Sequence, residues 1–440
     1  MTTPINKHVK SAKKFLTDNK MSPDQVNIDK ICSIFLDEMG NGLSGVKSSL
    51  MMIPTYIETE ENIPLGESVI VLDAGGTNFR TATVKFDKPG IPTITKFQKF
   101  PMPGTGDEGH VSKLEFFDRI ADFMKESVSD SSKIGFCFSY PTEIFPSGDG
   151  KLIHFVKEVK APEVEGSIIG ENLLTALKRK GLDYNKDIVI LNDTVATLLA
   201  GKAQEKQYES YIGFILGTGT NCSYIEKNSN IGKLQNLDLN KSQAINMESG
   251  QFDLFKGGVL DLEFMTTTDK PGEGRFEKML SGAYQGPLAL FVLKKAAEGG
   301  LFSDNFKTFI LNLSELKPAV MDGFLNNPEN SINLLGKFCS IKSDKIILYT
   351  LVDQLIERAA KLTASQLAAV VLKTGKGDNP TLPVSITADG TTYYKTRSLK
   401  FGTEFYLKEY LENIKNRYIE FCHIEDAPII GAAVAGLIQK

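Results

Sequence analysis

Two segments of this chain share one plan, and that repetition restricts the fold more than any other feature of the sequence. Residues 69–84 read VIVLDAGGTNFRTATV, and residues 211–226 read YIGFILGTGTNCSYIE. Each segment runs from an aliphatic strand through a small-residue turn, with threonine and asparagine, into a second strand, which is the pattern of a hairpin. The repeat therefore predicts two equivalent halves, and 440 residues also exceed the usual size of a single core.

The segments around the repeat predict a mixed α/β protein. TITKFQKF follows the first hairpin as a third strand-like run, which predicts an antiparallel meander over residues 69–100. A third turn of similar composition lies in VSITADGTTYYK, residues 384–395, and the pattern of residues 254–373 is mostly helical. Because no low-complexity linker separates the halves, we expect two lobes that share a hinge.

Composition excludes several classes of protein. The net charge of −4 provides no basic field for nucleic acid or an anionic membrane. The five cysteines and four histidines are scattered without metal-ligand spacing, which argues against a disulfide framework and a zinc site. No apolar run reaches the roughly 18 to 20 residues of a membrane helix, and no signal-type segment follows the polar N-terminus. We expect a cytoplasmic enzyme without nucleic-acid or membrane partners, either a monomer or a homodimer.

The three glycine- and threonine-rich turns have the composition of phosphate-binding loops. Glycine exposes backbone N–H donors because it has no Cβ, and threonine and asparagine add short polar groups beside them. Any one of these turns could be an ordinary hairpin. Three in one chain, two of them with matching flanks, favour a triphosphate held between the halves. The chain lacks the Walker motif G-x-x-x-x-G-K-[ST] and the kinase HRD and DFG motifs, so neither of those folds fits.

Asn192 and Asp193 stand where the buried strand IVIL ends and a helix begins. They could simply cap that helix, since both residue types are favoured caps. Ligands of open α/β sheets, however, bind at the carboxyl ends of the strands, where this pair lies. Beside bound phosphates, Asp193 could accept the proton of an attacking hydroxyl, as an aspartate does in other phosphoryl transferases.

Further polar residues at strand ends and in loops could complete such a site. Individually each is more often a solvated polar residue, and their spacing alone does not bring them together. These residues are Ser139, Lys157, Asn221, Glu248 and Glu277.

Seven short motifs follow one another from about residue 66 to the C-terminus: LDAGGTNFR, FSYP, LNDTVAT, GTGTN, NMESG, RFEKMLSG and ADGTTYY. In this order and spacing the set resembles the hexokinase family, in its acidic, single-unit, glucokinase-sized form. The resemblance implies an α/β protein with the two-lobed actin-like ATPase (ribonuclease H-like) fold, each lobe a mixed sheet flanked by helices. It implies a small lobe of residues 66–200 plus 427–440, and a large lobe of residues 1–65 plus 201–426. It also accounts for the internal repeat.

The resemblance implies roles for individual residues. The nucleotide-binding set begins with a first phosphate loop, which comprises Asp73, Gly75, Gly76, Thr77, Asn78 and Arg80. The second phosphate loop contributes Thr218 and Gly219. The loop near the adenosine contributes Gly390 and Thr391, and Ser340 joins them through the weaker match KFCS. The sugar-binding set comprises Ser139, Tyr140, Val156, Lys157, Asn192, Asp193, Asn221, Glu248 and Glu277. Asp193 would be the catalytic base and Lys157 the cation closest to the transferred phosphoryl group. ATP would be the donor, with Mg²⁺ held by ATP and by waters near Asp73, without direct protein ligands.

Two positions depart from the family pattern. Where the family usually has NWTK this chain has HFVK, so Val156 replaces a sugar-contacting threonine. In LSGAYQG, Ala283 stands where many members carry a lysine near the nucleotide. These departures leave the reaction class intact and bear on hexose specificity and nucleotide affinity.

The expected function is ATP-dependent phosphorylation of the 6-hydroxyl of a hexose, with glucose as the expected substrate, as in the first step of glycolysis. The alternative is a non-catalytic sugar sensor of the same fold, but a sensor should lose the base or a phosphate loop, and both are present. An actin-like polymerising switch would have no reason to keep Glu248 and Glu277. A ROK-type sugar kinase should carry a Cys/His zinc cluster, and the sequence has none.

Overall fold

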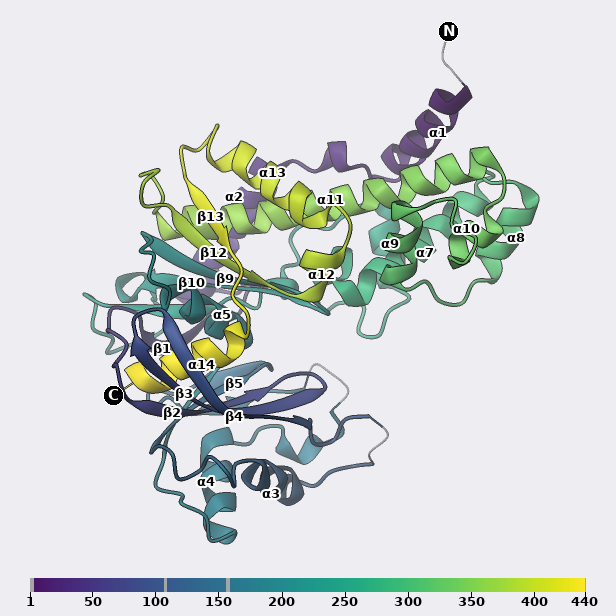
Figure 1. The fold of residues 1–440 in the computed structure, drawn as a ribbon. Coiled ribbons are helices and arrows are strands. Elements are labelled where there is room, and N and C mark those ends of the chain that lie inside the picture. Colours follow the sequence, from purple (N-terminus) through teal and green to yellow (C-terminus); the bar gives the residue numbers. More distant parts are fainter. Residues whose placement is uncertain (1–3, 107–108, 156–158, 440) are drawn as a thin grey trace.

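The computed structural model describes residues 4–106, 109–155 and 159–439, which form two sheets with helices around and between them (Figure 1). One sheet contains β2 (Ser68–Ala74), β3 (Asn78–Lys88), β4 (Ile91–Pro101), β5 (Lys133–Phe138) and β8 (Asp187–Leu191). The other contains β1 (Ile53–Glu58), β9 (Ser210–Leu216), β10 (Thr220–Lys227), β11 (Ser242–Asn246), β12 (Val384–Asp389) and β13 (Ile419–Cys422). A separate short hairpin consists of β6 (Thr142–Ile144) and β7 (Gly150–Leu152).

The two sheets share one connectivity. In the five-stranded sheet, of order β4-β3-β2-β5-β8, the first three strands form an antiparallel meander and the last two run parallel to β2. In the six-stranded sheet, β11, β10 and β9 form the equivalent meander, β12 and β13 run parallel to β9, and β1 is an extra edge strand. The sequence repeat is therefore a repeated half-sheet, and the meander predicted over residues 69–100 is confirmed.

Two helices lie between the sheets, α5 (Asp193–Lys202) and α14 (Ala427–Ile438) (Figure 1). Helix α14 packs on α5, β2 and β5, while α5 also packs on β9 and β12. All twelve residues of α14 are buried, as expected for a helix that is apolar on every side. A Cβ atom at Gly431 would lie 1.7 Å from the carbonyl oxygen of Ala196, so only glycine allows the two helices to approach this closely.

Helices α3 (Lys113–Phe123) and α4 (Ile169–Arg179) cover the opposite face of the five-stranded sheet. Successive strand residues point to opposite faces, so the two layers receive alternate residues of β2. Ile70 and Leu72 pack with α3 and α4, whereas Val69 and Val71 pack with α5 and α14. A continuous aliphatic strand is therefore required here because both faces of β2 are buried.

The remaining helices surround the six-stranded sheet and centre on α11, which spans 33 residues (Figure 1). They are α1 (Pro4–Asp18), α2 (Ile28–Ser44), α6 (Val259–Met265), α7 (Gly282–Glu298), α8 (Asp304–Asn312), α9 (Pro318–Asn326), α10 (Leu334–Phe338), α11 (Lys342–Thr374), α12 (Thr391–Lys395) and α13 (Leu399–Leu411). A buried ion pair between Arg358 and Asp261 joins α11 to α6. None of the helices in the described part of the chain combines the length and the hydropathy that a membrane span requires.

Candidate functional site

The first glycine-rich turn, residues 75–77, connects β2 to β3 at one end of the five-stranded sheet. The carbonyl groups of Gly75 and Thr77, and that of Ala74 before the turn, accept hydrogen bonds from neighbouring segments. Ser139 N–H donates to Ala74 O at 3.2 Å, and Met102 N–H donates to Thr77 O at 3.1 Å. Among the described residues, the N–H groups of Gly76 and Thr77 donate to no protein acceptor. The turn can therefore offer two backbone donors to an anion.

Asp73 and Arg80 face each other beside this turn. Asp73 is 3% exposed, and Arg80 Nε donates to its Oδ2 at 2.6 Å. A second guanidinium nitrogen of Arg80 lies 3.2 Å from Oδ1 of Asp426, just before α14. Burial lowers the pKa of Arg80, but the Asp73 carboxylate outweighs this effect, so the net shift of that pKa is upward. Arg80 was predicted to bind the nucleotide together with this turn, and in this structure it binds two carboxylates beside the turn.

The second and third turns lie against each other. Gly390 has φ +115°, and a Cβ there would lie 2.3 Å from Leu216 O, so the position requires glycine. Gly217 O accepts from Thr392 Oγ1 at 2.7 Å and from Gly282 N–H at 2.9 Å. Ala283, one of the two departures, donates its N–H to Thr218 O at 3.1 Å.

The structure therefore brings Thr218, Gly219, Gly390 and Thr391 together, and their nucleotide-binding roles stay predictions. Ser340 is exposed in the loop between α10 and α11. No hydrogen bond or ion pair among the described residues joins Ser340 to these turns.

Asn192 and Asp193 begin α5 at the end of β8. Asn192 is the helix cap, because its Oδ1 accepts from Thr194 N–H at 2.9 Å. Asp193 is the first residue of the helix and is partly exposed, in a position where the helix dipole favours a negative charge. Cys137 of β5 pairs with Asp73 of β2 on one side and with Leu191 of β8 on the other, and all three strands run parallel. Asp193, two residues after Leu191, therefore lies at the same edge of the sheet as the first phosphate turn.

A chain of amide and carboxylate groups connects the predicted sugar residues. Asn221 Nδ2 donates to Asn246 Oδ1 at 2.7 Å, and Asn246 Nδ2 donates to Glu248 Oε1 at 2.9 Å. Asn221 Nδ2 also lies 3.4 Å from Oδ1 of Asn192. The asparagine amides can donate and accept hydrogen bonds and the carboxylate accepts them, which together suits the hydroxyls of a polyol.

Glu277 adjoins this chain, since its Oε2 accepts from Thr220 N–H at 3.0 Å. Asn246 is a residue that the sequence reasoning missed. It stands at the end of β11, two residues before Glu248 in the motif NMESG, and that position next to a predicted ligand was the available signal.

Ser139 and Tyr140 follow β5 and contact the first turn. Ser139 is 8% exposed and Tyr140 1% exposed, and the Tyr140 hydroxyl donates to Gly75 O at 2.9 Å. No hydrogen bond among the described residues joins either side chain to the amide and carboxylate chain. Val156 and Lys157 lie outside the described residues, so their assigned roles stay predictions.

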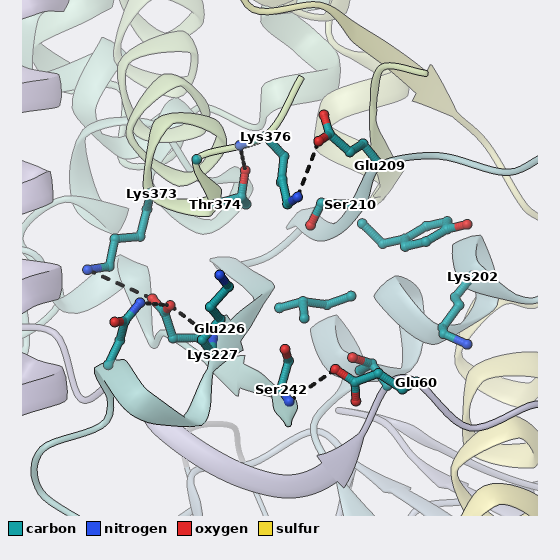
Figure 2. Close-up of a pocket in the computed structure, with 15 residues that line it drawn as sticks. Glu60, Lys202, Glu209, Ser210, Glu226, Lys227, Ser242, Lys373, Thr374 and Lys376 are labelled. Atoms are coloured by element: carbon teal, nitrogen blue, oxygen red, sulfur yellow. Dashed lines mark hydrogen bonds and ion pairs between the residues drawn. The ribbon is translucent and has the colours of Figure 1, made fainter. Parts of the chain in front are cut away.

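A polar pocket of about 450 Å³ lies away from these residues, at the opposite end of β9 and β10 (Figure 2). It contains none of the predicted site residues. Figure 2 shows Lys373 near Glu226 and Lys376 near Glu209, and their nitrogen–oxygen distances are 3.8 Å and 3.2 Å. Lys202, at the end of α5, lines the same pocket.

The described residues contain no group of three or more His, Cys, Asp or Glu side chains that could hold a metal ion.

Two half-sheets of matching connectivity, each with a glycine-rich turn after its first strand, define a protein of the two-lobed actin-like ATPase fold. Family models described as Hexokinase match residues 11–203 and 211–438. The chain belongs to the hexokinase family. A solved structure of a hexokinase from Schistosoma mansoni, complexed with glucose, shares the fold with a TM-score of 0.80 and 24% identity. That match covers 98% of this chain and 99% of the other.

Curated relatives agree in family and differ in length. Hexokinase-3 of Mus musculus is 29% identical over 405 residues, which is 87% of this chain and 43% of the relative. Hexokinase-1 of Saccharomyces cerevisiae is 28% identical over 459 residues, covering 96% of this chain and 91% of the relative. The chain thus spans less than half of the mouse protein and most of the yeast one.

Proposed function

We propose that this protein is an ATP-dependent hexokinase, with the 6-hydroxyl of glucose as the expected acceptor. One observation carries the proposal: Asp193 begins α5 at the sheet edge that holds Asp73 and the first phosphate turn. It directly follows Asn192, which lies within hydrogen-bonding distance of Asn221 in the chain Asn221–Asn246–Glu248. A base between a phosphate site and a polyol site is the arrangement that phosphoryl transfer to a sugar needs.

The proposed reaction uses these residues in fixed roles. Asp193 accepts the proton of the 6-hydroxyl while the sugar oxygen forms a bond to the γ-phosphorus. The bond between that phosphorus and the β–γ bridging oxygen breaks, and its electron pair leaves with ADP. The free N–H groups of Gly76 and Thr77, together with the Thr218–Gly219 turn, stabilise the phosphate oxygens. On the basis of the family resemblance, Lys157 is assigned the role of the cation closest to the transferred phosphoryl group.

Mg²⁺ fits beside Asp73 on the chemistry of its neighbours. The Asp73 carboxylate is next to the phosphate turn, but it already accepts bonds from Arg80. A water-mediated contact suits this arrangement, because Mg²⁺ usually keeps part of its water shell and binds through few protein ligands. When bound, the ion would neutralise charge on the β- and γ-phosphate oxygens.

The lobe assignment belongs to the same proposal: a small lobe of residues 66–200 plus 427–440, and a large lobe of residues 1–65 plus 201–426. Two observations support it. Strand β1 pairs with β11 in the six-stranded sheet, and α14 packs on β2 and β5 of the five-stranded one. Sugar binding would close the lobes and exclude water, which competes as a nucleophile. We also propose a cytoplasmic location and either a monomeric or a homodimeric state.

A coupled assay tests the activity directly. Purified protein with MgATP is assayed against glucose, mannose, fructose and N-acetylglucosamine, and sugar-dependent ADP release is expected with glucose. Asp193→Asn should keep the fold and lower kcat by about 10² to 10⁴, because the amide retains the shape and loses the basicity. Asp187→Asn, at the exposed start of the same strand β8, is the matched control. Sugar binding without turnover in the wild-type protein would instead support the sensor alternative.

A further inference from the structure

The hydroxyl of Tyr140 is bound to the backbone of the first phosphate turn. Tyr140 is 1% exposed, and its hydroxyl donates to Gly75 O at 2.9 Å across 65 residues of sequence. A carbonyl in this environment depends on a protein donor, since an unsatisfied buried carbonyl is costly. The tyrosine therefore fixes the peptide unit that joins Gly75 to Gly76, whose other polar group is the N–H of Gly76.

Three other carbonyls around the turn are also fixed by donors. Ala74 O accepts from Ser139 N–H, Thr77 O accepts from Met102 N–H, and Asn78 O accepts from Gly75 N–H. The bond from Tyr140 differs from these three because its donor is a side chain. A substitution can therefore remove it without changing the backbone.

The ring of Tyr140 contacts a different segment. It lies edge-to-face against Phe155, with ring centroids 4.9 Å apart and planes at 88°, and it is tilted against Phe138 at 5.0 Å. Phe155 is also held from its backbone, because its N–H donates to Glu165 Oε1 at 2.8 Å. Phe155 is the residue directly before Val156 and Lys157 in the sequence. One side chain thus contacts the phosphate turn through its hydroxyl and Phe155 through its ring.

The hydroxyl stays a donor at working pH. Burial raises the pKa of Tyr140, and the nearby charges of Asp193 and Asp73 raise it further. The phenol therefore remains protonated, and a protonated hydroxyl is what the Gly75 carbonyl requires.

We propose that Tyr140 acts as a positioning residue for the first phosphate turn, rather than as the sugar ligand that the sequence predicted. The inference rests on the proposed phosphoryl transfer. It assigns separate roles to the two parts of the side chain: the hydroxyl holds the turn and so affects nucleotide affinity and rate, and the ring packs between Phe138 and Phe155.

Tyr140→Phe separates these effects, because it removes the hydroxyl and keeps the ring. Loss of one buried hydrogen bond should lower kcat/KM for ATP by about 3- to 10-fold. The dissociation constant for glucose, measured by calorimetry without nucleotide, should stay within about twofold of the wild-type value, which is less than one such bond is worth. Tyr140→Leu removes the ring packing on Phe138 and Phe155 as well and should lower the free energy of unfolding, whereas Tyr140→Phe keeps that packing. Tyr406→Phe, whose hydroxyl bonds Glu357 far from the site, is the matched control and should change neither constant.

Hydrogen exchange gives a readout that does not depend on turnover. The hydrogen-bonded amides around the turn, those of Gly75, Met102 and Ser139, should exchange faster in Tyr140→Phe than in the wild type, since the turn has lost one of its supports. Unchanged exchange together with unchanged ATP constants would overturn the proposal. A glucose constant that rises as much as the ATP constant would also overturn it, because the hydroxyl would then be a sugar ligand. Absence of any sugar-dependent turnover in the wild type would instead refute the proposed function, and the exchange experiment would still test the bond.

Discussion

Arg80 Nε donates to Asp73 Oδ2 at 2.6 Å, across two strands that flank the first phosphate turn. The same guanidinium reaches Asp426 at 3.2 Å, 346 residues further along the chain. Asp73 is almost fully buried, whereas the Asp426 side chain is 46% exposed. The two contacts of Arg80 should therefore differ greatly in energy, because water screens only the second.

Arg80→Gln should destabilise the protein by about 3 to 5 kcal/mol, because it removes the opposite charge from the buried Asp73 carboxylate. Asp426→Asn should cost less than about 1 kcal/mol, the usual worth of an exposed ion pair. Urea unfolding of both variants measures the difference. The double variant Asp73→Asn with Arg80→Gln should be more stable than Arg80→Gln alone. Equal losses of unfolding free energy for Arg80→Gln and Asp426→Asn would show that the buried Arg80–Asp73 pair contributes no more stability than the exposed contact with Asp426.

Glucose should make the protein more compact by closing the two proposed lobes, with or without ATP. Binding energy from the sugar would drive this movement before the base is correctly placed. The chain has no tryptophan, so intrinsic tryptophan fluorescence cannot report the change. Small-angle scattering with and without saturating glucose is the suitable measurement. An unchanged radius of gyration in active protein would contradict closure.

Val156→Thr should lower KM for glucose by a few-fold to roughly tenfold with kcat little changed. A threonine hydroxyl can add one neutral hydrogen bond to the sugar, worth about 0.5 to 1.5 kcal/mol. A contact away from the reacting oxygen acts on ground and transition state alike, so it appears in KM. Steady-state kinetics of the variant checks both constants. An equal or higher KM would mean that Val156 does not face the sugar.

Glu38→Gln should destabilise the protein at pH 7 and flatten the acid side of its stability profile. Glu38 is 5% exposed and accepts bonds from the N–H and hydroxyl of Ser49, at 2.7 and 2.8 Å. Burial raises the pKa of Glu38, but these bonds and those from Ser48 and Asn41 outweigh it, and the net shift is downward. A carboxyl group with a lowered pKa in the folded state stabilises the protein above its ordinary pKa. That contribution is lost as the pH falls through the lowered value.

Urea unfolding at pH 7 and near pH 3 measures this effect. The wild type should lose more stability between the two pH values than Glu38→Gln does. At pH 7 the variant should be about 1 to 3 kcal/mol less stable, because charged acceptors make the stronger hydrogen bonds. If both proteins lose the same stability between pH 7 and pH 3, the pKa of Glu38 is not lowered by its hydrogen bonds in the folded state.

The sequence alone was sufficient for the features that depend on local spacing. Alternating apolar residues and a glycine-rich turn predict a hairpin wherever they occur, so the repeat at residues 69–84 and 211–226 predicted the two related sheets. The position of Asn192 and Asp193 between strand and helix could be read in the same way, because caps and strand ends have local signals. The motif order was enough to indicate the family, which the family models confirm.

Only the tertiary structure decided which distant groups meet. The bond from Tyr140 to Gly75 spans 65 residues, and the one from Arg80 to Asp426 spans 346. Asn246 joins Asn221 to Glu248 because β10 and β11 pair antiparallel. The periodicity of either strand does not predict that contact. Local sequence determines backbone conformation over a few residues. The partner of a buried polar group is determined by the packing of whole sheets and helices, where each donor must find an acceptor from another part of the chain.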